Sequence, residues 1–132
     1  MKQLLAILFT LALLTGCATL QPGADPLIVR SQQTEKVAFD TFDTFLKLEY
    51  RYADKVKKTV PEVSKFADWL REPVGNSPRG IAMVKSLGNV RKAYTAAKTP
   101  DNKAKLGSAV DALAAVLDET KKHLTAAQAA SK

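Results

Sequence analysis

Four prolines that follow helix-capping residues divide most of this chain into helical segments. The four signals are Asp25-Pro26, Thr59-Val60-Pro61, Ser77-Pro78 and Thr99-Pro100. Proline fits the first turn of a helix but disrupts its interior, so each signal marks the start of a new helix. The third residue after Thr59 is Glu62, which is the spacing of a capping box. We therefore expect helices over residues 26–58, 61–72, 78–98 and 100–125.

Apolar side chains within these segments recur at helical spacing and do not show the alternation typical of strands. The clearest stripe lies in the last segment, where Leu106, Val110, Leu113 and Leu117 share one face. Four amphipathic segments joined by short connections predict an all-α fold, a small antiparallel bundle of three to four helices. The tail, residues 126–132, has no large apolar residue, and we expect it to fray.

Composition supports a folded domain that is held together by packing alone. The chain has 132 residues, with 46% hydrophobic and 25% charged residues, which is ordinary for one globular domain. The only cysteine is Cys17, so no disulfide can form within the chain. We expect the folded domain to cover residues 25–132.

The first residues have the layout of an export signal. Lys2 supplies a positive start, residues 4–14 form the apolar run LLAILFTLALL, and small residues follow it. This run is too short to span a bilayer, which takes about 20 apolar residues. We expect residues 1–16 to be a cleaved signal peptide.

The end of this signal, Leu14-Thr15-Gly16-Cys17, resembles the lipobox of bacterial lipoproteins. The resemblance covers residues 1–17 and implies cleavage between Gly16 and Cys17. It also implies that Cys17 carries a diacylglycerol on its sulfur and an acyl chain on its nitrogen. This lipid would then anchor the protein in the cell membrane. In such lipoproteins, an aspartate directly after the cysteine favours retention in the inner membrane. This chain has Ala18 at that position. If the host has two membranes, we therefore expect the protein in the outer membrane, facing the periplasm.

Residues 17–24 would then form the acylated cysteine and a short tether. Seven residues from Ala18 to Ala24 extend over at most about 25 Å, and Pro22-Gly23 is a turn signal. The folded domain would therefore start close to the lipid surface.

The string FDTFDTF at residues 39–45 is the most unusual part of the domain. Phe39, Phe42 and Phe45 would spread over a broad arc of a helix. Together with Trp69 they could line a ligand pocket, or form a docking face for a partner helix, although a bundle core is the simpler interpretation. Trp69 is expected to be a partly buried packing residue, and a place at a lipid interface is the alternative.

The net charge of +7 favours anionic partners, although a solvated surface is the simpler interpretation. Lys55, Lys57 and Lys58 form the only basic cluster, with Asp54 beside it. These lysines are candidates for contact with phospholipid headgroups or cell-wall polymers. Export argues against a nucleic-acid partner.

Histidine and cysteine, which often act in catalysis or bind metals, occur once each. His123 is the only histidine, and it has neither a second histidine nor a free thiol to share a metal. It lies near the expected end of the last helix, where a cation is favourable. We find no phosphate-binding loop and no nucleophile elbow. We expect no catalytic residues, no metal site and no cofactor, and we expect that the protein is not an enzyme.

These features predict an envelope lipoprotein that acts as a non-catalytic accessory or structural binding module. Its partner would be another envelope protein or peptidoglycan. Murein lipoproteins attach to peptidoglycan through a terminal lysine, and Lys132 shares that single residue. One alternative is a helical carrier or sensor of a small apolar ligand. Another is a phage-related lipoprotein for lysis, exclusion or immunity.

Overall fold

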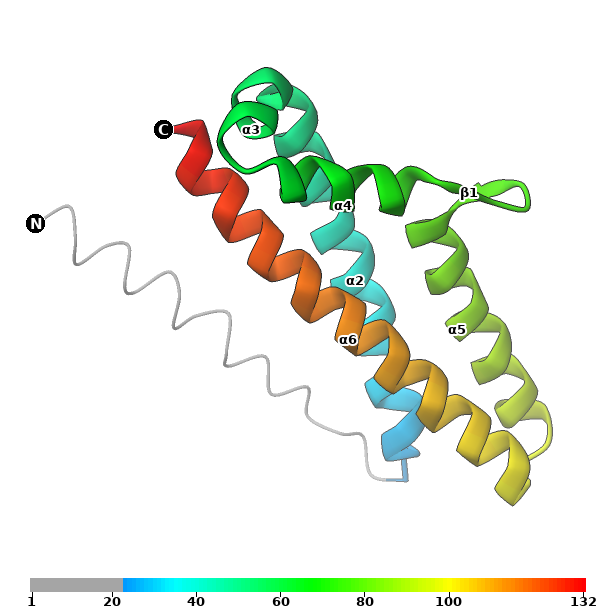
Figure 1. Ribbon diagram of the computed structural model, residues 1–132. Helices are drawn as coiled ribbons and strands as arrows, with labels where there is room; N and C mark the ends of the chain where they lie inside the picture. The colour runs from blue at the N-terminus through cyan, green and yellow to red at the C-terminus, as the bar shows by residue number, and fades with distance from the viewer. Residues whose placement is uncertain (1–22) are drawn as a thin grey trace, which may run out of the picture.

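The computed structural model describes residues 23–132 and folds them into a helical bundle (Figure 1). The predicted signal peptide, Cys17 and most of the predicted tether lie outside the described residues. The described elements are α2 (Pro26–Arg51), α3 (Ala53–Thr59), α4 (Pro61–Arg71), β1 (Pro73–Val74), β2 (Ser77–Pro78), α5 (Arg79–Ala96) and α6 (Pro100–Ser131). The predicted all-α class is confirmed, with five helices in this part of the chain.

Two of the four predicted helix starts are capped as expected. The carboxylate of Asp25 accepts a hydrogen bond from the backbone N–H of Leu27 at 3.0 Å, and Pro26 is the first residue of α2. The hydroxyl of Thr99 accepts from the backbone N–H of Asn102 at 3.2 Å at the start of α6. Each cap satisfies a backbone donor that has no partner inside the helix.

The predicted capping box at Thr59 is wrong, although the chain does break there. Thr59 is the last residue of α3, and Val60 precedes α4 without a side-chain cap. Val60 has φ −141° and ψ 69°, outside the helical region. Pro61 accounts for this break, because its ring disfavours a helical conformation in the residue before it.

The segment between the predicted helices that end at residue 72 and begin at residue 78 forms a small hairpin, which includes the predicted helix start at Ser77-Pro78. Its two short strands are antiparallel, with Val74 opposite Ser77. Gly75 has φ +60° at the first position of the two-residue turn, which suits a type II′ turn and a residue without a Cβ. α5 then begins one residue later than predicted, at Arg79.

The predicted continuous helix over residues 26–58 is also wrong. It is interrupted at Tyr52, which has φ −116° and ψ 27°. Neither Tyr52 nor Ala53 forbids a helix, so packing decides the break. Because the chain turns at Tyr52, α3 can bury Val56 completely while Lys55 stays exposed.

Three long helices, α2, α5 and α6, form the body of the bundle (Figure 1). Consecutive long helices are antiparallel, as predicted, so α2 and α6 run parallel to one another. Arg30 near the start of α2 pairs with Asp111 of α6 at 2.9 Å, and Lys55 of α3 reaches the carbonyl of Ser131 at 3.3 Å. The short helix α4 crosses one end of this body rather than extending it (Figure 1).

The predicted fraying of the tail is wrong. α6 continues to Ser131, and both Ala127 and Ala130 are buried in the core. Small side chains suffice at these positions because α3 covers the end of α6. The other core residues are Ala38, Phe42, Phe45, Val56, Val63, Ala67, Leu70, Val84, Leu87, Tyr94, Leu106, Val110 and Leu113. All of these core residues lie between residues 38 and 130 of the described part of the chain.

Candidate functional site

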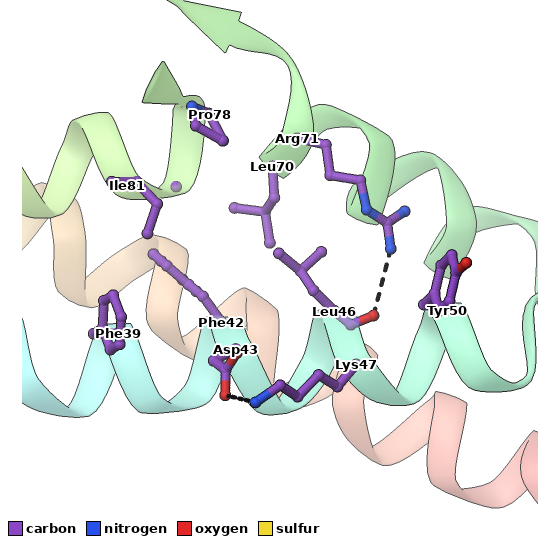
Figure 2. Close-up of a pocket in the computed structure, with 11 residues that line it drawn as sticks. Phe39, Phe42, Asp43, Leu46, Lys47, Tyr50, Leu70, Arg71, Pro78 and Ile81 are labelled. Carbon is purple, nitrogen blue, oxygen red and sulfur yellow. Dashed lines mark hydrogen bonds and ion pairs between the residues drawn. The ribbon is translucent and has the colours of Figure 1, made fainter. Parts of the chain in front are cut away.

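An apolar groove of about 400 Å³ lies between α2, α4 and the hairpin with the first turn of α5 (Figure 2). Phe42, Leu46 and Leu70 supply apolar side chains along its length. Figure 2 shows Phe39 and Ile81 at one end of the groove and Tyr50 at the other. The groove therefore collects side chains that are far apart in the sequence.

A glycine allows the wall of this groove to form. Gly80 in the first turn of α5 is buried, and an added Cβ would lie 3.2 Å from Phe42 and 3.4 Å from Leu70. These separations are tighter than ordinary contacts between carbon atoms. The absence of a side chain at Gly80 therefore lets α5 approach α2 and α4 closely.

Two exposed aromatic side chains stand at the ends of the groove. Phe39 is 50% exposed and Tyr50 is 80% exposed. They are about three turns apart on α2, or about 16 Å. Phe39 is thus half exposed and Tyr50 mostly exposed, although the core lies beside them. An apolar groove flanked by such side chains is a candidate binding site.

The charged groups around the groove are paired. Asp43 and Lys47 form an exposed pair at 2.7 Å. Arg71 donates to the buried carboxylate of Glu49 at 2.6 Å, and the hydroxyl of Ser64 donates to the same carboxylate at 3.1 Å. These pairs leave little net charge along the groove. It therefore suits an apolar occupant better than an ion.

The buried pair of Glu49 and Arg71 was missed by sequence reasoning, although a signal was present. Glu49 is four residues after Phe45 and seven after Phe42, so it occupies the core face of α2. A charged residue at a core position requires a partner. The partner, Arg71, lies in a different helix and could not be identified from spacing.

Phe42 and Phe45 are buried in the core, and Phe39 is half exposed, so the three phenylalanines do not share one ligand or partner face. Phe39 and Phe42 line the groove, whereas Phe45 contacts Phe66 with ring centres 5.7 Å apart. Trp69 stacks on Phe66 at 5.5 Å, and the guanidinium of Arg79 lies 5.0 Å from the centre of its ring. Trp69 is therefore a partly exposed packing residue outside the groove.

His123 belongs to this aromatic cluster and not to a helix end. Its ring stacks on Phe66 at 4.4 Å, and its Nε2 lies 3.5 Å from a carboxylate oxygen of Glu119. Because α6 continues to Ser131, the predicted place of His123 in the last turns is wrong. Among residues 23–132, no three His, Cys, Asp or Glu side chains are grouped closely enough to hold a metal ion.

A hydrogen bond between the side chains of Tyr94 and Asp25 connects the end of α5 to the start of α2. The hydroxyl of Tyr94 donates to the Asp25 carboxylate at 2.9 Å, and Lys98 lies 3.5 Å from the same oxygen. The Tyr94 hydrogen bond, more than the charge of Lys98, lowers the pKa of Asp25. The same bond raises the pKa of Tyr94. This contact holds the point at which the predicted tether meets the bundle.

The predicted basic cluster of Lys55, Lys57 and Lys58 lies on α3 and its side chains are exposed. It is at the opposite end of α2 from Asp25, and it does not line the groove. The structure therefore does not bring these lysines together with the phenylalanines.

Comparisons of this chain with protein-family models, with curated proteins and with solved structures found no match. Within residues 23–132, none of the helices combines the length and the apolar character needed to cross a bilayer.

Proposed function

We propose that this chain is an envelope lipoprotein whose helical bundle is a non-catalytic binding module. The lipobox-like ending at Cys17 supports the lipid anchor, and the apolar groove with its two exposed aromatic side chains supports the binding role. The groove is the observation that carries this proposal. According to this proposal, lipid on Cys17 holds the bundle at the membrane, and the groove binds another envelope protein.

The occupant that we propose is the apolar face of a helix from that protein. The groove follows α2 for about three turns, which is long enough for anchors at positions i, i+3 or i+4, and i+7 of a docked helix, since these span about two turns. Aromatic and arginine side chains dominate the binding energy of most protein interfaces, and Phe39, Tyr50 and Arg71 are placed for that role. The paired rim charges favour an apolar helix face over a strongly charged one.

One observation favours a carrier or sensor of a small apolar ligand as a second candidate. The groove volume of about 400 Å³ lies in the range typical of small-molecule sites. A flexible acyl chain or a similar apolar molecule would fit the groove without any polar contact. Native mass spectrometry of the purified protein separates the candidates, because a carrier would retain a ligand at one copy per chain.

The residues around the groove support a role without catalysis. Among the described residues that line it, none is a serine, cysteine, threonine or histidine. Its carboxylate and its basic side chains are engaged with one another or with Glu49. A serine or cysteine nucleophile with an adjacent histidine base is therefore not offered by this lining.

Photo-crosslinking in cells tests the proposal. A photoreactive residue would replace Phe39 or Tyr50, and a matched control probe would replace Lys103, which is exposed on α6. We expect one discrete protein adduct from the groove probes and none from the control probe. An adduct of equal yield from all three positions, or no protein adduct at all, would contradict the docking role.

The anchor is tested separately with Cys17→Ala. We expect this variant to lose the mass of the acyl chains and to leave the membrane fraction. Full retention in the membrane fraction, with no mass change relative to the unsubstituted protein, would show that lipid on Cys17 is not the anchor. The groove experiment could still succeed in that case, because the groove lies within residues 39–81.

A further inference from the structure

Exposed basic side chains without ionic partners gather at one end of the bundle. Arg51, Lys55, Lys57 and Lys58 are all exposed and lie within one short stretch that contains a single acidic residue, Asp54. None of these four side chains forms an ion pair with any residue that the structure describes. We name these four residues the basic end.

The basic end lies far from the point where the tether would join the bundle. α2 has 26 residues and is therefore about 39 Å long. It starts at Pro26 and leads to Arg51 at its other end. Figure 1 shows α3 and the C-terminal end of α6 together at the end opposite the start of α2. A lipid on Cys17 and the basic end would thus be two separate points of contact.

The charge of the basic end favours an anionic lipid surface. Lysine and arginine side chains are attracted to the negative surface potential of an anionic leaflet. Tyr50 directly precedes Arg51 in the sequence, but it lines the groove. The membrane contact therefore depends on the four cationic side chains alone.

We propose that the basic end binds the headgroups of an anionic phospholipid bilayer. The attraction is electrostatic. In a lipidated protein this second contact would lay the bundle along the membrane surface. The binding itself does not depend on the lipid, so it can be measured on a chain that lacks Cys17.

Co-sedimentation of residues 23–132 with vesicles tests this proposal. Circular dichroism verifies that residues 23–132 and each variant of them are folded. The vesicles would be phosphatidylcholine with or without phosphatidylglycerol. We expect binding only to the vesicles with phosphatidylglycerol, and we expect weaker binding as salt is raised, because salt screens exposed charges.

Two variants with the same net charge locate the contact. Lys57→Gln with Lys58→Gln removes two charges from the basic end, and Lys92→Gln with Lys103→Gln removes two exposed charges from α5 and α6. Each lysine near an anionic surface contributes about fivefold in partitioning, so the first variant should bind about 25-fold more weakly. The second variant should change by less than about threefold.

Three outcomes would overturn the proposal. Equal losses in the two double variants would mean that net charge alone drives binding. Equal binding to vesicles with and without phosphatidylglycerol would mean that the contact is not electrostatic. Binding to peptidoglycan sacculi that is lost in Lys57→Gln with Lys58→Gln, while vesicle binding is unchanged, would assign the basic end to the cell wall.

Discussion

The buried ion pair between Glu49 and Arg71 gives the sharpest prediction about stability. The Glu49 side chain is 6% exposed, and that of Arg71 is 36% exposed. In Arg71→Met the apolar stem is largely kept, while the guanidinium is removed. Glu49 is then left buried with Ser64 as its remaining hydrogen-bond donor. The change therefore tests how much this fold depends on pairing one charge beside the groove.

The expected loss follows from the burial of the two partners. Removing one member of a fully buried pair typically costs 3–5 kcal/mol, because the other charge stays in an apolar environment. Water already reaches part of the Arg71 guanidinium, which reduces this cost. We expect Arg71→Met to lower the free energy of unfolding by about 2–3 kcal/mol at neutral pH.

A double-mutant cycle separates charge from packing. In Glu49→Gln the buried side chain is neutral and can still accept the Ser64 hydrogen bond. In that background, Arg71→Met should cost only about 1 kcal/mol, so the coupling between the two positions is about 1–2 kcal/mol. Urea unfolding followed by circular dichroism measures all four proteins. Equal costs of Arg71→Met in the two backgrounds, or a cost below about 0.5 kcal/mol in the first, would refute the reasoning.

Three further predictions concern the core, a helix cap and pH. Leu113→Ala should lower the free energy of unfolding by about 2–5 kcal/mol in urea, because Leu113 is 1% exposed in the core; a loss below about 1 kcal/mol would mean that the site is not well packed. Thr99→Ala should cost about 1 kcal/mol, because it removes the cap of α6, and Thr95→Ala, which removes no cap, serves as its control. Tyr94→Phe should destabilise the protein at neutral pH, because the Tyr94 hydroxyl lowers the pKa of Asp25 below its usual 3.8. A group with a lowered pKa stabilises the folded state above its unfolded pKa, so the difference between wild type and Tyr94→Phe should shrink as pH falls below about 4. A difference that is unchanged between pH 7 and pH 2 would contradict this assignment.

The candidate site shows how far the chain's residue pattern predicts a groove. The phenylalanine string indicates that this part of α2 meets apolar surroundings. It does not tell which phenylalanine faces which neighbour. Phe39 and Phe42 line the groove while Phe45 enters the cluster with Phe66, because α4 crosses the bundle instead of running along it. The crossing direction of α4 depends on contacts between distant segments.

Glu49 and Gly80 are two further residues whose roles local sequence alone does not predict. A charged residue on the core face of α2 and a glycine at the start of a helix are both visible in the sequence. Each has its effect through a distant partner, Arg71 for the first and Phe42 for the second. Their roles therefore become clear only when those partners are in place.

The sequence by itself determined where helices begin when a local rule acts within a few residues. Asp25 and Thr99 cap their helices through bonds to backbone groups two or three residues away, and Pro61 ends the preceding helix by its own shape. Only the tertiary structure decided the break at Tyr52 and the ordered tail. At both places the local propensities allow either outcome, and burial of Val56 and of Ala130 against other helices selects one of them. Burial is a property of the assembled bundle, and no short window of residues contains it.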